Sequence, residues 1–298
     1  MRVSAWIVNY NSCDLVEACI RSLRNNGVTD AVVVDNSEST EEVARLQQLN
    51  SRDFPIEVFS SGGNLGYGAA LNSIGRRVAM APNDVVCILN PDTRSHSGSV
   101  HSIVEALKAG TCDIVSPHIV GGSMSQPTSW FSGGRFNPVS CSASHVDFGR
   151  EIDLLGEVGI RESQFLSGAA MLMARSTWDR LGGFDESYFM YWEDVELSLR
   201  ARRLGMRLAV SDKWYLWHEE GGTGAREPLR GAPYYRFMSE NRVRLAHSLG
   251  ISSWRLVVGS GARETLRLVF APIRNREPRS AHKALTALAG TLRGIARG

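Results

Sequence analysis

The chain has 298 residues, 43% of them hydrophobic, which is enough to bury the core of one large α/β domain or of two small ones. Its best apolar stretch, residues 165–174, is far too short to span a membrane, and its five cysteines lack the paired spacings of a disulfide framework or a zinc knuckle. The net charge of +2 combines −8 for residues 1–227 with +10 for residues 228–298, where twelve arginines and one lysine accompany three glutamates.

The N-terminal part alternates between strand and helix patterns. Its first residues enter a strand directly, without a secretory signal, which predicts a cytosolic protein. The expected elements are strands at 3–8, 31–34 and 56–59, a helix between Ser12 and Asn26, and a helix at 40–49. Right-handed crossovers would make a doubly wound sheet that binds ligands beyond the carboxyl ends of its strands, where Asn9, Asp35 and Asn64 fall.

The first strand-to-helix turn, residues 9–13, contains no glycine. Dinucleotide-binding folds need glycines there so that the backbone can approach a pyrophosphate. The sequence therefore argues against NAD or FAD, and also against a sugar-nucleotide pyrophosphorylase, whose N-terminal loop is rich in glycine.

Two later turns have residues suited to a diphosphate and to a cation. Gly66 and Gly68 open a helix whose start would accept a diphosphate, although a turn packed against the sheet explains them equally well. Asp92 follows the strand 85–89 and is well placed to hold a divalent cation. A local hydrogen-bonding turn is the alternative for Asp92.

The middle of the chain is less regular. We expect a helix at 98–107, strands at 114–116 and 207–210, and a buried element at 165–175; the poor periodicity of 121–161 predicts loops or a small meander over the site. His96 and His101 are predicted to lie on the surface of a helix. His218 precedes a glycine-rich segment and is either a metal ligand or a packed histidine.

The stretch 182–197 organises the chain: a glycine turn, an aromatic run and then acids at the start of a helix. Shielding by Tyr191 and Trp192 would raise the pKa of a neighbouring carboxyl toward that of a general base. The alternative is that the acids only complement the helix dipole. The helix itself is predicted from an apolar stripe of Val195, Leu199 and Leu204.

Six motifs together resemble the inverting GT-A glycosyltransferases of family 2, and most closely their bacterial rhamnosyltransferase-like branch. The resemblance covers residues 3–225. The motifs are Val8-Asn9-Tyr10-Asn11, Val34-Asp35-Asn36, Asn64-Leu65-Gly66-Tyr67-Gly68, Asn90-Pro91-Asp92, Gly182-Gly183-Phe184-Asp185 and Tyr191-Trp192-Glu193-Asp194-Val195-Glu196.

The resemblance implies how the nucleotide-sugar donor binds. Asp35 would hydrogen-bond a pyrimidine base, and the pocket for the base would be lined by the end of the first strand, Val8, Asn9 and Tyr10. Asn64 and Gly68 would border the ribose and the diphosphate. Asn90 and Asp92 would complete the donor site.

It also implies roles for a metal and a base. Asp92 would hold Mg²⁺ or Mn²⁺ together with His218, and Asp194 would be the catalytic base. Glu193 would act beside Asp194 by orienting the acceptor. The implied acceptor-binding residues are Gly168, Trp192 and Glu193.

Three residues depart from the family pattern. Asn90 replaces the first acid of Asp-x-Asp, a form usual in the rhamnosyltransferase-like branch. Leu71 stands where many relatives have an arginine near the diphosphate, and Glu219 stands where relatives often have a second histidine.

The implied fold is α/β: a GT-A domain at 1–227, with a Rossmann-like nucleotide-sugar-binding half at about 1–115 and an acceptor-binding half at about 116–227, followed by a helical extension at 228–298. The implied reaction transfers L-rhamnose from dTDP-L-rhamnose to a lipid-linked or cell-envelope glycan with inversion. A UDP-sugar donor with another acceptor is one alternative. A non-catalytic protein that binds nucleotide-sugar or glycan is the other.

The basic extension is predicted to be helical at 235–238, 254–258 and 266–273, with interruptions at Gly250, 259–261 and 272–278. Arginines interleaved with aliphatic residues favour peripheral contact with the anionic inner face of the cell membrane, or with a polyprenyl diphosphate acceptor. Packing on the acidic domain and a homodimer interface are the alternatives. No recognisable nucleic-acid-binding module is present, so no nucleic-acid partner is expected.

Overall fold

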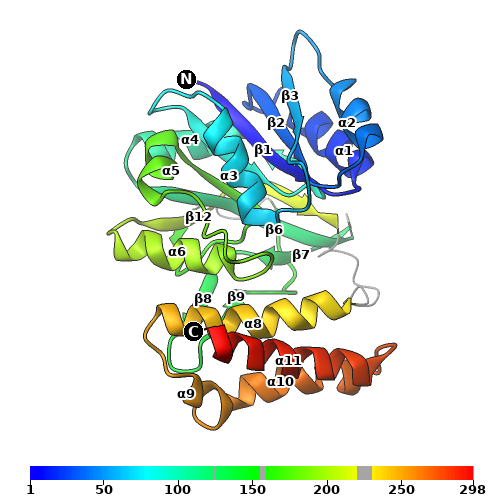
Figure 1. Ribbon diagram of the computed structural model, residues 1–298. Helices are drawn as coiled ribbons and strands as arrows, with labels where there is room; N and C mark the ends of the chain where they lie inside the picture. Colours follow the sequence, from blue (N-terminus) through cyan, green and yellow to red (C-terminus); the bar gives the residue numbers. More distant parts are fainter. Residues whose placement is uncertain (124, 155–158, 220–229, 298) are drawn as a thin grey trace.

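The computed structural model describes residues 1–123, 125–154, 159–219 and 230–297. A twisted mixed sheet flanked by helices forms the upper part of the molecule in Figure 1, and the C-terminal helices lie together beneath it. The expected α/β architecture with a helical extension is confirmed. The expected boundary between residues 227 and 228, with the glycine-rich segment before it, lies outside the described residues.

The main sheet has the strand order β10-β12-β6-β11-β4-β1-β2-β3, with β5 paired to β12 and β7 paired to β6. Strands β1 to β4 are mutually parallel, and β11 runs antiparallel between β4 and β6. A separate hairpin consists of β8 and β9. The strand bounds are β1 Val3–Asn9, β2 Asp30–Asp35, β3 Ile56–Ser60, β4 Val85–Leu89, β5 Thr93–Gly98, β6 Ile114–Ser123, β7 Gln126–Phe131, β8 Gly134–Asn137, β9 Ser142–His145, β10 Ile160–Glu162, β11 Ala170–Ala174 and β12 Leu208–His218.

The central strands β1, β2 and β4 are buried along their whole lengths, as expected for parallel strands covered on both faces. On one face Trp6 of β1 meets Trp178 edge to face, with ring centroids 5.1 Å apart. The helices of the upper part are α1 Cys13–Leu23, α2 Thr40–Gln47, α3 Tyr67–Arg77, α4 Val100–Lys108, α5 Arg175–Leu181 and α6 Glu193–Arg203.

Several local expectations differ from the structure. The region expected to open a helix near residue 98 first forms β5, so His96 lies on a strand, where its ring packs against Trp217. Strand β12 extends to His218 rather than ending near residue 210, because it pairs with β5 as well as with β6. Leu204 is 42% exposed, because it caps α6 instead of continuing the buried stripe of that helix.

The C-terminal helices are α8 Ala232–Ser248, α9 Ser253–Val257, α10 Ala262–Arg274 and α11 Ser280–Arg297. Pro272 lies inside α10 and does not end it, and α11 is a long helix that was not among the expected elements. Val243, Leu245 and Ala246 of α8 belong to the same hydrophobic core as the sheet. Among the described residues, no helix combines the length and the apolar character needed to cross a bilayer.

Candidate active site

The carboxyl ends of β1 and β2 bring Asn9 and Asp35 together, because these residues are direct partners in the parallel register. The side-chain amide of Asn9 donates to Asp35 Oδ1 at 2.8 Å and to Glu42 Oε2 at 2.9 Å. Ser37 Oγ donates to the same Asp35 oxygen at 2.7 Å. One oxygen of Asp35 is thus fixed by the protein.

The other oxygen, Asp35 Oδ2, is buried and accepts no hydrogen bond from the described residues. A buried oxygen without a donor is costly, so a ligand N–H would stabilise it. Tyr10, the residue directly after Asn9 and the end of β1, is 54% exposed. The arrangement fits a group such as a pyrimidine base, which carries both a ring face and an N–H.

The turn before α3 is held by amide side chains. Asn36 Nδ2 donates to Asn64 Oδ1 at 3.0 Å, and the Gly66 amide donates to the same oxygen at 3.1 Å. Gly66 has a φ of +84°, and a Cβ there would collide with the carbonyl oxygen of Phe189. The Tyr67 amide donates to that carbonyl at 3.0 Å, so the start of α3 is bonded to the loop that precedes α6.

Gly68 is required by packing, because a Cβ there would lie 2.7 Å from Cβ of Phe184. Asn64, by contrast, is exposed at the turn. Asn64 is thus accessible to a ligand, and its contact with a ribose or diphosphate stays a prediction. Gly68 has a packing role in the structure, because it lets α3 approach the loop that contains Phe184.

Strand pairing explains why Asp92 and His218 meet. Thr93 of β5 is the register partner of His218 of β12, and the Glu219 amide donates to the Asp92 carbonyl at 3.0 Å. Asp92 Oδ1 lies 3.2 Å from His218 Nε2, and both side chains are buried. The ring of Trp130 packs on His218 with centroids 4.4 Å apart.

The donor set suits a divalent cation. Asp92 Oδ1 is buried and accepts no hydrogen bond from the described residues, and carboxylate and imidazole are both ordinary ligands of such ions. Within the described ranges no cluster of three or more His, Cys, Asp or Glu side chains is available to a metal. The described residues therefore supply two ligands here, Asp92 and His218, and a bound diphosphate could add further oxygens.

Asn90 is engaged through its main chain. Its amide donates to the Ala169 carbonyl at 2.9 Å, and its own carbonyl accepts from Thr93 Oγ1 at 2.7 Å. The first of these bonds fixes the turn that carries Asp92 against the start of β11, and the second closes the turn itself.

Asp194 is held from two directions. Its Oδ2 accepts from the Gly168 amide at 2.9 Å, and its Oδ1 accepts from the Val195 amide at 2.8 Å. Tyr67 donates its hydroxyl to the Gly168 carbonyl at 2.6 Å. Backbone from another segment thus orients the carboxylate at the start of α6.

Burial sets the protonation chemistry of this cluster. It raises the pKa of Asp194, which the amide hydrogen bonds only partly oppose, and burial together with the charge of Asp194 raises the pKa of Glu193 to about 8. Glu193 is 7% exposed and its Oε2 accepts no hydrogen bond from the described residues. Acids that only complement a helix dipole would be solvated, so the burial favours a chemical role.

Tyr67 is a site residue to which the sequence analysis gave no role. Burial, followed by the charges of Glu193, Asp194 and Asp92, raises the pKa of its phenol well above the usual value. The phenol therefore stays protonated near these three acids and donates its hydroxyl hydrogen bond to the Gly168 carbonyl. Its position in the Gly-Tyr-Gly motif was the available signal.

The turn before α6 has two consecutive left-handed residues, Tyr191 with φ of 67° and Trp192 with φ of 73°. Such conformations cost on the order of 1–3 kcal/mol each and persist only where neighbours hold them. Asn241 of α8 donates to the carbonyls of Met190 and Tyr191 at 2.9 and 3.0 Å. Helix α8 therefore holds the turn that presents Glu193 and Asp194.

Trp192 is 6% exposed, and its indole N–H donates to the Met238 carbonyl at 3.1 Å. In this structure it joins the turn to α8. Its contact with an acceptor, like that of Gly168, stays a prediction.

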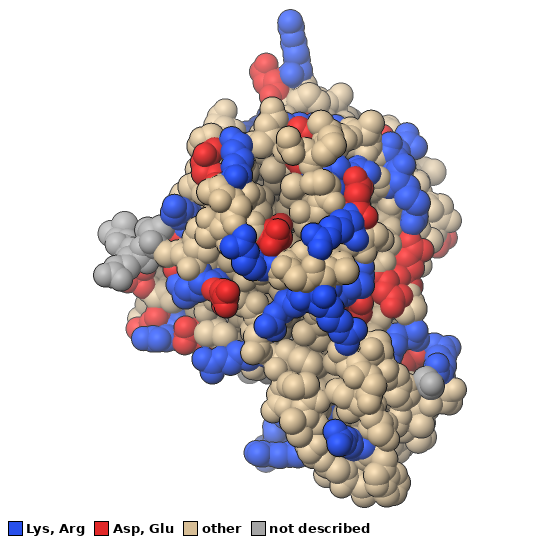
Figure 2. Space-filling view, turned by 90° about the vertical axis from the view of Figure 1, so that its left-hand side faces the viewer, with Lys and Arg blue, Asp and Glu red and all other residues tan. Residues whose placement is uncertain are grey.

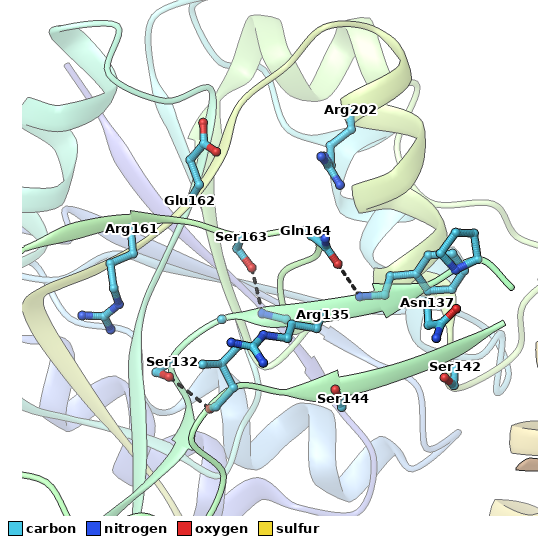
Figure 3. A pocket seen from close by; sticks show the side chains of 15 residues that line it. Ser132, Arg135, Asn137, Ser142, Ser144, Arg161, Glu162, Ser163, Gln164 and Arg202 are labelled. Carbon is cyan, nitrogen blue, oxygen red and sulfur yellow. Dashed lines mark hydrogen bonds between the residues drawn. The ribbon is translucent and has the colours of Figure 1, made fainter. Parts of the chain in front are cut away.

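A separate cavity of about 790 Å³ lies between the β8–β9 hairpin, β10 and the end of α6 (Figure 3). None of the residues predicted for the site lines it. Arg135 and Arg202 extend toward it from β8 and α6, whereas Arg161 is paired with Asp212. Residues 163–168 connect this cavity to Asp194. Ser163 and Gln164 line the cavity, and the Gly168 amide donates to the Asp194 carboxylate.

The mixed sheet, with polar side chains at the carboxyl ends of its parallel strands and a buried acid pair at the start of α6, defines a glycosyltransferase of the GT-A class. The solved structure of GalNAc-T7 with UDP, GalNAc and Mn²⁺ has the same fold, with a TM-score of 0.59 over 85% of this chain and 52% of that chain at 15% identity. The family model described as glycosyl transferase family 2 matches residues 4–155. The chain belongs to this family.

Two curated relatives extend the match beyond residue 155. The low-salt glycan biosynthesis hexosyltransferase Agl10 of Haloferax volcanii is 31% identical over 207 residues, which cover 67% of this chain and 62% of that protein. The N-acetylglucosaminyl-diphospho-decaprenol L-rhamnosyltransferase of Mycobacterium tuberculosis is 30% identical over 228 residues, which cover 70% of this chain and 72% of that protein.

Proposed function

We propose that this protein transfers L-rhamnose from dTDP-L-rhamnose to a hydroxyl of a polyprenyl-diphosphate-linked or other cell-envelope glycan, with inversion at the anomeric carbon. The observation that carries the proposal is the buried pair Glu193 and Asp194, which lies near enough to the Asp92–His218 pair that Glu193, Asp194 and Asp92 all act on the phenol of Tyr67. The mycobacterial relative, an N-acetylglucosaminyl-diphospho-decaprenol L-rhamnosyltransferase, supports the choice of donor and acceptor.

The donor base is held at the carboxyl ends of β1 and β2. Asp35 Oδ2 accepts the N–H of the pyrimidine, while Asn9 and Ser37 keep the other carboxylate oxygen in place. The exposed ring of Tyr10 covers one face of the base. Thymine and uracil share the N–H that Asp35 recognises, so this contact selects a pyrimidine without choosing between dTDP and UDP.

The diphosphate is directed toward Asp92 and His218. These residues would hold Mg²⁺ or Mn²⁺, which when bound offsets the negative charge that develops on the leaving diphosphate. Glu219, the residue after His218, forms an ion pair with Arg94 at 3.0 Å, so its carboxylate is neutralised by a guanidinium group of the protein.

Asp194 acts as the base. It takes the proton of the acceptor hydroxyl as the oxygen attacks the anomeric carbon, the bond from that carbon to the diphosphate oxygen breaks, and the bonding electrons leave with the diphosphate. Because attack and departure occur on opposite faces, one displacement inverts the configuration. The protonated Glu193 adds no second negative charge and can donate a hydrogen bond that orients the acceptor.

The cavity in Figure 3 receives the remote part of the acceptor. Arg202 is eight residues beyond Asp194 on α6, or about 12 Å along the helix, which suits an acceptor larger than one sugar. The guanidinium groups of Arg135 and Arg202 favour an anionic part such as a phosphate. The enzyme would then work in the cytoplasm at the inner face of the cell membrane, where lipid-linked glycans are presented.

A calorimetric panel tests the donor. It compares dTDP-rhamnose, UDP-glucose, UDP-GlcNAc, UDP-galactose and GDP-mannose, each with and without Mn²⁺. Selective, metal-dependent binding of dTDP-rhamnose is expected. Selective binding of a UDP-sugar would reassign the donor while keeping the reaction, and binding without transfer to any glycan acceptor would support a non-catalytic binding protein.

A further inference from the structure

The C-terminal helices expose an unusual amount of apolar surface. Nine of the large hydrophobic side chains that are exposed in this protein lie between residues 254 and 292. They are Trp254, Val257, Val258, Leu266, Phe270, Ile273, Leu285, Leu288 and Leu292, and we call them the apolar face. In Figure 2 the lower part of the molecule, formed by these helices, is mostly uncharged and carries few Lys and Arg side chains, which gather in larger number above it.

Packing forces the leucines of α11 outward. A Cβ on Gly290 would collide with the Arg236 carbonyl oxygen of α8, and one on Gly294 would lie 2.6 Å from Cβ of Val243. The small-residue side of α11 is therefore pressed against α8. Leu285, Leu288 and Leu292, spaced as one helical stripe, lie on the other side and are 66%, 44% and 58% exposed.

Helix α10 places cations directly beside its apolar stripe. Leu266, Phe270 and Ile273 are exposed on one side of the helix. The neighbouring stripe is also exposed and consists of Arg263, Arg267 and Arg274. An apolar stripe with arginines along its border is the pattern of a helix that lies in the plane of a membrane surface.

We propose that the apolar face docks on an anionic lipid bilayer. Trp254, Phe270 and the leucines enter the boundary between headgroups and acyl chains, and Arg263 and Arg274 pair with lipid phosphates. Large hydrophobic side chains exposed together in this way mark an interaction site.

Charge decides between a bilayer and a second copy of the chain. The two carboxylates of this region are already neutralised inside it, because Glu264 pairs with Arg267 and Glu277 pairs with Lys283. A second copy docked through the same face would therefore bring arginines against arginines across the interface. An anionic bilayer supplies the opposite charge.

Helix α8 contacts both the helices that carry the apolar face and the turn before the proposed catalytic acids. Helix α8 packs on α11 through Gly290 and Gly294, and it also holds the left-handed turn before Glu193 through Asn241. This inference extends the proposed function, because a lipid-linked acceptor is presented at a membrane. Its test measures vesicle binding alone, so its failure is distinguishable from a failure of donor binding or of transfer.

Flotation of the full chain with vesicles provides the test. Vesicles of phosphatidylcholine containing about one-third phosphatidylglycerol should bind the protein at low salt, and vesicles of phosphatidylcholine alone should bind it at least tenfold more weakly. The double variant Leu285→Glu/Leu288→Glu should lose at least tenfold in affinity for the anionic vesicles. The matched control is Leu204→Glu, which changes an exposed leucine at the C-cap of α6 and should bind as the wild type does.

A second variant keeps the test informative if the first is unstable. Arg263→Gln/Arg274→Gln should weaken binding by about fivefold per arginine at low salt and by much less at high salt. Unchanged thermal midpoints and donor binding establish that both variants are folded. Equal vesicle binding by wild type and both variants would overturn the proposal. So would a lipid-free dimer, seen by sedimentation, that the leucine variant converts to a monomer.

Discussion

The Gly168 amide donates a 2.9 Å hydrogen bond to Asp194 Oδ2, so a segment that leads into β11 holds a carboxylate at the start of α6. An amide donor stabilises the ionised form of the acid, whereas burial stabilises the neutral form, and burial prevails. The result is a carboxylate of raised basicity held in a fixed position. Both properties are what proton abstraction from a hydroxyl requires.

Asp194→Asn should abolish sugar transfer while leaving donor binding intact. The amide keeps the shape of the side chain but cannot accept the hydroxyl proton, so we expect a loss of about 10²–10⁴-fold in kcat. A transfer assay and calorimetry with the nucleotide-sugar measure the two effects separately. Asp53→Asn, at an exposed position distant in sequence from the site, is the control and should behave as the wild type. Normal transfer by Asp194→Asn would show that another group is the base.

Asp92→Ala and His218→Ala should each weaken the metal-dependent part of donor binding. Asp92 Oδ1 and His218 Nε2 lie 3.2 Å apart, so each variant removes one of the two ligands that the described part of the chain places here. Titration of the donor with and without Mn²⁺ measures the effect, and the variants should approach the metal-free affinity of the wild type. His101→Ala on the exposed part of α4 is the control. Equal donor affinities of the wild type and Asp92→Ala in the presence of Mn²⁺ would show that Asp92 does not bind the metal.

The sequence was sufficient to predict the parallel strands and the turns after them. Val85–Leu89 is one continuous apolar run, and such a run is informative because both faces of a parallel strand are buried. Strand β5 was missed because residues 93–98 contain serines, an arginine and a histidine, and only pairing with β12 makes them a strand. That pairing also places His218 beside Asp92, which local pattern alone does not contain.

The support of the site was equally hidden from local patterns. Asn241 lies in a helix of the basic extension, and nothing in its neighbourhood indicates that it holds the carbonyls of Met190 and Tyr191. Two left-handed residues other than glycine are likewise not encoded by a turn signal. Long-range contacts supply both features, so they became visible only in the folded chain.

Arg202→Gln and Arg135→Gln should raise the KM for an anionic acceptor severalfold without changing donor affinity. Both guanidinium groups line the cavity in Figure 3, and loss of one removes charge-assisted hydrogen bonds to a phosphate. Steady-state kinetics with acceptors that contain and lack a phosphate measure the effect. Arg203→Gln changes the next residue of α6, which does not line the cavity, and should leave the KM unaltered. If all three variants had the KM of the wild type, the acceptor would have to bind outside this cavity.

Gly66→Ala should destabilise the protein and weaken donor binding. The residue has φ of +84°, and an added Cβ would collide with the Phe189 carbonyl oxygen, so the bond between the start of α3 and the loop before α6 must loosen. We expect a loss of about 2–4 kcal/mol, or roughly 4–16 °C in the thermal midpoint. Gly63→Ala is the matched control, because a Cβ there meets nothing closer than 3.6 Å. Similar thermal midpoints for the two variants would contradict the argument.

Glu193→Gln should flatten the decline of stability toward alkaline pH. In the folded chain the pKa of Glu193 is raised from 4.5 to about 8, so between these values the native state holds a proton that the unfolded chain releases. This contribution is complete below pH 4.5 and is lost as the pH rises through about 8. The variant has no such proton, so its thermal midpoint should gain several degrees on that of the wild type between pH 5 and 8. Glu41→Gln, at an exposed position of α2, should keep the wild-type slope, and parallel curves for wild type and Glu193→Gln would mean that Glu193 is already ionised at neutral pH.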